Sequence, residues 1–210
     1  MRTVGIFCIC LWTAFLAGCV SVLPEEPEPS KKIVLTPQLS KKIVGNNISS
    51  ALIVDKPFML ESLDSTRVKI ILQDKSGVAL SEFIAGVEWC DRLPALLQEV
   101  LITLYEKTGK FTAVGQAEER FYAAHRLLLT ITHFEVVKEA DSSMKVVIGF
   151  SAKLINSQRR IVVAQKNFFQ KFAVKEEGLQ GIMKAFERAT SVTFSEMIQW
   201  TFEKAKIEKM

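Results

Sequence analysis

The first nineteen residues constrain this chain most, because they decide in which compartment it folds. Arg2 precedes an uncharged run of 13 residues from Val4 to Leu16, and two small residues follow that run. A positive start, a short apolar core and a small-residue end are typical of a secretory signal. A helix of this length rises about 20 Å, whereas the hydrocarbon core of a bilayer is roughly 30 Å thick. We therefore expect residues 1–18 to be a removed signal peptide and not a transmembrane helix.

The end of this signal, Leu16-Ala17-Gly18-Cys19, resembles the lipobox of bacterial lipoproteins. The resemblance implies cleavage before Cys19, acylation of the Cys19 sulfur with a fatty acid such as palmitate, and acylation of the new N-terminus. Two or more acyl chains anchor a protein stably to a membrane, whereas one chain does so only marginally. The alternative is an ordinary secreted protein that is cut near Gly18 and in which Cys19 has no role.

Residues 19–50 have the composition of a flexible tether. Prolines and glutamates dominate its first part, and the pentapeptide Ser30–Val34 recurs as Ser40–Val44. The repeat fits either a basic spacer near anionic lipid or a solvated linker with one or two short edge strands, and we favour the linker. Residues 51–210 then form one domain of about 160 residues, which is large enough to bury a core.

The charge and cysteine content exclude some classes of protein. The chain carries 27 basic and 23 acidic residues, a net charge of +4, and we find no dense basic stripe in it. This balance argues against an electrostatic nucleic-acid binder. After signal removal only Cys19 and Cys90 remain, so Cys90 has no intramolecular partner. We expect Cys90 to be a buried, inert thiol, and a reactive or intermolecular thiol is the alternative.

Hydrophobic periodicity in the first half of the domain predicts three strands and a helix. The strands cover about 51–54, 67–72 and 78–83, and the last two form a hairpin around the turn Asp74–Gly77. An apolar stripe then predicts a helix over about 91–107, with Asp91 as N-cap and Gly109 just past its end. The stripe consists of Leu93, Leu96, Leu97, Val100, Leu101, Leu104 and Tyr105.

The second half predicts a short strand at 111–114, three long strands and a final helix. The long strands cover about 126–138, 146–154 and 160–172 and should form an antiparallel meander. The last helix covers about 178–205, and its polar face includes Glu187, Arg188, Ser191, Ser195, Glu196 and Gln199. The predicted fold is α+β: one mixed, largely antiparallel sheet with two packed helices.

The sequence contains no recognisable catalytic motif, and we assign no catalytic residue, metal or cofactor. His125 and His133 lie eight residues apart, so both would point to one face of an unbroken strand. A metal would need further ligands, and Glu135 is the only obvious one nearby. Histidines on a half-buried strand are therefore the better interpretation, and we predict that the protein is not an enzyme.

Aromatic residues suggest two further candidates. Phe168, Phe169 and Phe172 on the last strand, with Phe194 and Phe202 on the last helix, would line either a groove for a lipid chain or, as we favour, a packed core. Two tryptophans are candidate partner-binding residues. Trp89 stands at the junction of a strand and a helix, where a core role is the favoured alternative, and Trp200 lies off the apolar stripe of the last helix.

Three segments together resemble the ABC-type transport auxiliary lipoproteins. They are Leu63–Val68, Glu88–Gln98 and Thr108–Val114, and the Trp-x-Asp-x-Leu-Pro core at 89–94 is the most specific part. The chain departs from the family pattern at Cys90, where a small residue is usual. Residues 33–37 match the usual start of the family domain only weakly.

The resemblance implies a non-enzymatic lipoprotein on the periplasmic side of a Gram-negative envelope. Its expected partners are the membrane, through acylated Cys19, and the mammalian-cell-entry (MCE) subunit, permease and ATPase of an ABC transporter that traffics lipid. Val20 after the lipidated cysteine favours the outer membrane over the inner one. Homo-oligomerisation is left open, and the alternative function is a structural or assembly lipoprotein unrelated to transport.

Overall fold

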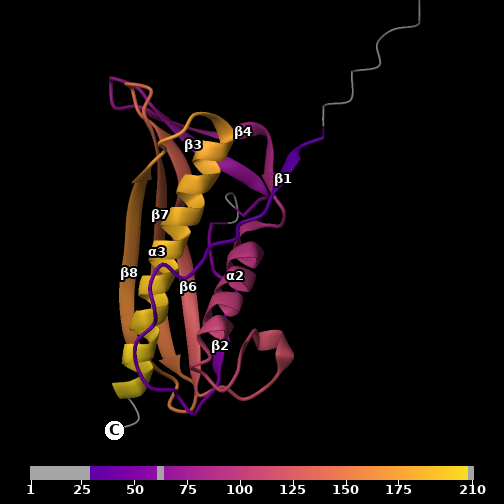
Figure 1. The fold of residues 1–210 in the computed structure, drawn as a ribbon, viewed down its shortest axis with the longest axis vertical. Coiled ribbons are helices and arrows are strands. Elements are labelled where there is room, and N and C mark those ends of the chain that lie inside the picture. The colour runs from indigo at the N-terminus through magenta and orange to yellow at the C-terminus, as the bar shows by residue number, and fades with distance from the viewer. Residues whose placement is uncertain (1–28, 61–63, 208–210) are drawn as a thin grey trace, which may run out of the picture.

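The structure is a computed structural model that describes residues 29–60 and 64–207. A mixed sheet of eight strands carries two long helices on one face, α2 (Leu93–Thr108) and α3 (Gly178–Ile207) (Figure 1). The expected α+β fold is confirmed. The strands are β1 (Lys31–Ile33), β2 (Leu52–Val54), β3 (Arg67–Gln73), β4 (Ala79–Trp89), β5 (Val114–Gly115), β6 (His125–Lys138), β7 (Met144–Asn156) and β8 (Ile161–Ala173).

Strand β6 is the centre of the sheet. On one side it pairs with β7, and β7 pairs with β8, which gives the expected antiparallel meander. On the other side β6 pairs in parallel with β2 near its start and with β3 near its end. From β3 the sheet continues through the antiparallel partner β4 to β1, and from β2 it continues to β5. The parallel pairs of β6 with β2 and β3 join segments that are far apart in the sequence.

The core lies between the sheet and the two helices. Alternating side chains of β7 point inward, including Ile148, Phe150 and Leu154, and all three are buried. The helices also contact each other, because the Tyr105 hydroxyl of α2 lies 2.7 Å from the hydroxyl of Thr201 on α3. Burial raises the pKa of Tyr105, so its hydroxyl stays protonated in this dry contact.

Residues 29–50 differ from the expected tether, because they belong to the folded domain. Residues 31–33 form β1, and residues 34–44, which we call the strap, run on between α2 and α3 (Figure 1). Leu35 and Ile43 of the strap are only 3% and 5% exposed. Burial of these two apolar side chains is favourable, because it removes their surface from water, and it holds the strap against the domain. The predicted signal peptide and the first tether residues, 1–28, lie outside the described residues.

Polar side chains on α3 hold the strap by its backbone. The Gln38 N–H donates to Ser191 Oγ at 3.1 Å, and the Ser40 N–H donates to Ser195 Oγ at 2.8 Å. The Val44 N–H donates to Gln199 Oε1 at 2.9 Å, and Gln199 Nε2 donates back to the Val44 carbonyl at 3.2 Å. These α3 residues are spaced four apart, so they form one ridge along the helix.

Candidate functional site

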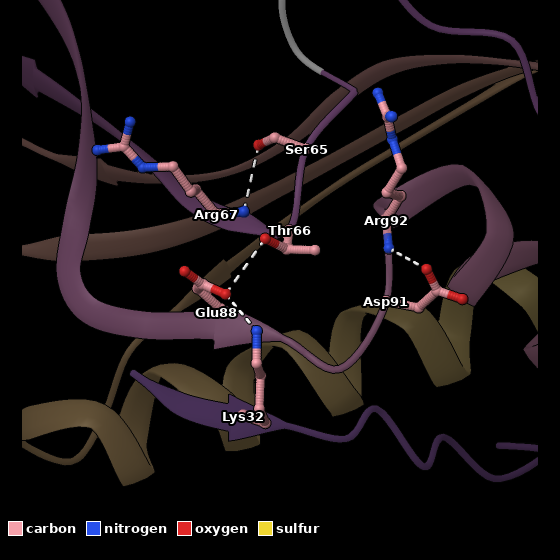
Figure 2. Close-up of polar contacts among 7 residues, drawn as sticks. All are labelled: Lys32, Ser65, Thr66, Arg67, Glu88, Asp91 and Arg92. Carbon is pink, nitrogen blue, oxygen red and sulfur yellow. Dashed lines mark hydrogen bonds and ion pairs between the residues drawn. The ribbon is translucent and has the colours of Figure 1, made fainter. Parts of the chain in front are cut away.

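Two of the three sequence segments that carry the family resemblance meet at the start of α2. Residues 64–67 enter β3, residues 88–92 link β4 to α2, and Lys32 of β1 lies beside them; we call this group the junction (Figure 2). The Trp89 N–H donates to the Thr66 carbonyl at 2.6 Å, and the Leu93 N–H donates to the Ser65 carbonyl at 3.3 Å. The first segment thus satisfies backbone donors of the second, including one at the start of the helix.

Glu88 is the electrostatic centre of the junction. Its carboxylate forms an ion pair with Lys32 and accepts a hydrogen bond of 3.3 Å from the Thr66 hydroxyl (Figure 2). The hydrogen bond from Lys32 is the largest effect that holds the pKa of Glu88 below its ordinary value, and its partial desolvation opposes this shift. The carboxylate therefore fastens β1 to β4 as a charged group.

Arg92 joins the junction to α2. Its Nε lies 3.0 Å from Asp64 Oδ1, and its Nη2 donates to the Asp64 carbonyl at 2.7 Å. Arg92 itself is the N-cap of α2, so the predicted cap at Asp91 is one residue early. Asp91 instead accepts a hydrogen bond of 2.6 Å from the Arg92 N–H. The predicted C-terminal signal is correct, because Gly109 adopts a left-handed conformation with φ of 60°.

Trp89 lies beneath this polar layer and is only 1% exposed. Its ring makes edge-on contacts with Phe134 and Phe186, with centroids 5.7 and 5.2 Å away. Trp200 is also buried, at 6% exposure, and packs edge-on against Phe168. The prediction that Trp89 and Trp200 bind a partner is therefore corrected for the folded monomer: both side chains are core.

The prediction of a buried Cys90 is wrong, because its thiol is free and exposed. Trp89 pairs with Ile33 and points into the core, so the next side chain along the strand, Cys90, points outward. The Cys90 N–H donates to the Ile33 carbonyl at 2.9 Å. Cys90 lines a groove of about 320 Å³ between the strap and α2. The other apolar residues that line this groove are Val34, Leu35, Pro37, Leu96, Val100 and Leu104, and its polar lining includes Glu99 and Lys107.

The two histidines point to different faces of β6, contrary to the expectation for an unbroken strand. A β-bulge between Ile131 and His133 shifts the alternation, so His125 is buried with the core while His133 lies beside Glu135 on the other face. His133 Nδ1 is 2.7 Å from Glu135 Oε1, and Lys69 Nζ is 3.8 Å from Glu135 Oε2. Within the described ranges, no group of three His, Cys, Asp or Glu side chains is placed to hold a metal ion.

The aromatic groups of the last strand and helix pack mainly as core. Phe168, Phe194 and Phe202 are buried, and Phe194 contacts Phe150 with centroids 5.5 Å apart. Phe172 is partly buried against the same core, and Phe169 is the exception, with half of its surface exposed. This arrangement favours the core alternative over a lipid groove between these elements.

The strap ridge on α3 is the feature that sequence reasoning missed. Ser191, Ser195 and Gln199 were assigned to a solvated helix face, whereas they bind the strap backbone. The sequence signal for this contact was the pair of serines, Ser191 and Ser195, which lie four residues apart on one face of the predicted helix. None of the helices within 29–60 and 64–207 has the length and apolarity that crossing a bilayer requires.

Comparison with known proteins identifies relatives of this fold. The model of a family described as "ABC-type transport auxiliary lipoprotein component" matches residues 34–197, which begin at the first strap residue. An uncharacterized protein of Bradyrhizobium diazoefficiens is 24% identical over 176 residues, which are 82% of this chain and 46% of that protein. The chain thus spans about half the length of this curated relative.

Two solved structures share the fold. The crystal structure of a Xanthomonas campestris protein superimposes with a TM-score of 0.70 at 21% identity, covering 86% of this chain and 97% of that one. The crystal structure of an uncharacterized protein gives a TM-score of 0.60 at 14% identity, with coverage of 82% and 99%. At these identities the similarity concerns the fold alone.

Proposed function

The chain belongs to the ABC-type transport auxiliary lipoprotein family, and from this membership we propose that it is a non-enzymatic, lipid-anchored subunit of an MCE-type ABC transporter. In this role it would act on the periplasmic side of a Gram-negative envelope, in lipid trafficking. The observation that carries the proposal is the family match over 34–197, which includes the strap, the junction and most of α3.

The chemistry of the junction supports a binding role over catalysis. Four of its charged groups form ion pairs, Glu88 with Lys32 and Arg92 with Asp64, while Arg67 lies over the ring of Phe83. Its main hydrogen bonds connect backbone segments, as in a structural clamp. The groove beside it is mainly apolar, with polar residues that include Glu99 and Lys107, and it is partly open, as expected of a surface that contacts another protein or a small ligand.

The anchor that we propose at Cys19 would hold the domain close to a membrane. Because β1 is paired with β4 from Lys31 onward, only residues 19–30 would be free to act as the tether. Twelve residues span at most about 40 Å when fully extended and average about 20 Å as a coil. A domain on so short a tether stays at the bilayer surface, and Val20 favours the outer membrane as its location.

Metabolic labelling tests the anchor. Cells grown with radioactive palmitate should label the wild-type chain and not Cys19→Ala, and the wild type should remain in the membrane fraction. A mature protein whose mass includes no acyl chain would exclude the anchor.

Co-purification tests the partners. An affinity-tagged chain, cross-linked in intact cells, should retain an MCE-domain protein with its permease and ATPase, and an untagged strain should retain none of them. Recovery of only secretion or cell-wall proteins would replace this proposal with the alternative, an assembly lipoprotein of the envelope.

A further inference from the structure

Strand β8 is an open edge of the sheet. Over the described part of the chain it pairs with β7 alone, along 13 residues from Ile161 to Ala173 (Figure 1). Such an edge presents a row of unpaired backbone donors and acceptors, which a second extended chain can use.

The register identifies which backbone groups are free. The Val174 N–H donates to the Met144 carbonyl at 2.9 Å, so position 174 faces β7. Hydrogen-bonded residues alternate along an antiparallel ladder, and the pairing is regular from Lys145 to Leu154. Even-numbered residues from 164 to 172 therefore face β7. Odd-numbered residues from 165 to 173 direct their N–H and carbonyl groups to the open edge.

The β7–β8 hairpin carries charge of one sign. Residues 142–175 contain seven cations and no carboxylate, although the whole chain has a net charge of only +4. Antiparallel pairing places these cations along the β7–β8 edge of the sheet, where Lys145 forms an ion pair with Glu139. They are Lys145, Lys153, Arg159, Arg160, Lys166, Lys171 and Lys175.

Two of these cations lie on β8 itself. Lys166 Nζ stands 4.9 Å from the centre of the Phe168 ring, and Lys171 Nζ stands 5.2 Å from that of Phe169. Within residues 29–60 and 64–207, neither ammonium has a carboxylate at ion-pair distance. Exposed apolar side chains lie on the same strand, namely Ile161, Val162 and Phe169.

We propose that β8 binds an extended, acidic segment of a partner protein as an added β-strand. The open edge supplies main-chain hydrogen bonds. Side chains alternate along a strand, so Lys166 lies with Phe168 on the face that α3 covers, whereas Lys171 and Phe169 lie on the opposite face. Each lysine therefore attracts a carboxylate on its own face of the added strand, and Phe169 adds an apolar contact beside Lys171. A second copy of β8 is disfavoured, because pairing would bring two strands of like charge together. Anionic lipid headgroups would use the charges but leave the row of backbone groups unpaired. This inference does not depend on the function proposed above.

A synthetic peptide tests the proposal on the full chain in detergent. The probe has about twelve residues of glutamate and valine in a Glu-Glu-Val-Val repeat, which places glutamates on both faces of an extended strand, and its binding is measured by fluorescence anisotropy. Lys166→Glu with Lys171→Glu should weaken binding by about tenfold or more, since two attractive contacts become repulsive. Lys75→Glu with Lys107→Glu is the matched control, because both lysines are exposed and lie on the β3–β4 turn and on α2, neither of which pairs with β8. This control should bind like the wild type.

Backbone variants separate strand addition from simple charge attraction. Asn167→Pro removes one N–H from the open edge and none from the β7 ladder, so it should abolish binding. Asn167→Ala should bind normally. The same peptide with methyl groups on alternate backbone nitrogens gives a second test that needs no variant, and it should not bind.

Three results would overturn the proposal. The first is that the wild type does not bind the acidic peptide. The second is equal binding of the methylated peptide, which would indicate contact through charge alone. The third is that phosphatidylglycerol added to the micelles binds in place of the peptide and loses affinity in the Lys166→Glu, Lys171→Glu variant, which would identify β8 as a lipid contact.

Discussion

Two of the outer strands of the sheet, β1 and β8, form edges that are built in opposite ways. At one edge β1 has three residues, pairs in parallel with the end of β4 and continues directly into the strap. At the other edge β8 has 13 residues and pairs with β7 alone among the described strands. At the first edge the chain's own N-terminal segment closes residues Val87–Trp89 of β4, whereas the second edge is long, cationic and open. The difference separates a surface that holds the domain together from one that can accept another chain.

Trp89→Ala should have the largest effect, because Trp89 supports the closed edge from within. Its ring fills the core beneath β1, so its loss should cost roughly 3–5 kcal/mol of unfolding free energy, a large share of the 5–15 kcal/mol typical of a domain. Urea denaturation of the two proteins measures the change. If the midpoint is unchanged, Trp89 does not support this edge.

Leu35→Ala should destabilise the domain by about 2–5 kcal/mol, because Leu35 is a strap side chain that is buried against the rest of the domain. The matched control is Val34→Ala, whose side chain is 59% exposed and whose loss should change stability by no more than about 0.5 kcal/mol. Equal, negligible effects of both variants would mean that residues 34–44 are a free tether after all.

Ser195→Ala tests one of the hydrogen bonds that hold the strap to α3. The variant leaves the Ser40 N–H without its acceptor, which should cost about 1 kcal/mol. Ser195→Thr keeps the acceptor oxygen and serves as the control. Faster proteolysis within residues 34–44 should accompany the loss of stability in the alanine variant alone.

Glu88→Gln should have the smallest effect, and one that depends on pH. Since the pKa of Glu88 is lowered in the folded protein, its carboxylate stabilises the fold above the ordinary value of 4.5, and this stabilisation is lost as pH falls further through the lowered pKa. The variant should therefore melt slightly below the wild type at pH 7, and the difference should vanish in acid. If the difference in melting temperature between the two proteins grew as the pH fell, the ionised Glu88 carboxylate would not be the stabilising form.

The C-terminal half of the fold was predictable because its contacts are local. Alternation in β7 and the long apolar stripe of α3 gave both elements nearly at their observed bounds, since each buries one continuous face. The bulge in β6 was not predictable: the switch of alternation after Ile131 only becomes evident from the pairing with β7.

The N-terminal half was harder because distant segments decide it. The strap has little periodicity of its own, and its partners on α3 lie about 150 residues further along the chain. The junction was foreseen as a family motif but not as a contact, since Thr66 and Trp89 meet only through the parallel and antiparallel pairs around β4. The exposure of Cys90 likewise depends on the pairing of β1 with β4, and no local sequence pattern predicts that pairing.

Residue-resolved amide hydrogen exchange on the free protein tests the contrast between the two edges most directly. We expect slow exchange at Cys90 and Ser40, whose N–H groups are bound by Ile33 and Ser195. Along β8 we expect fast exchange at Asn167 and Lys171 and slow exchange at Phe168 and Phe172, in strict alternation. Fast exchange at Ser40 and Cys90 together with uniform protection along β8 would contradict the account.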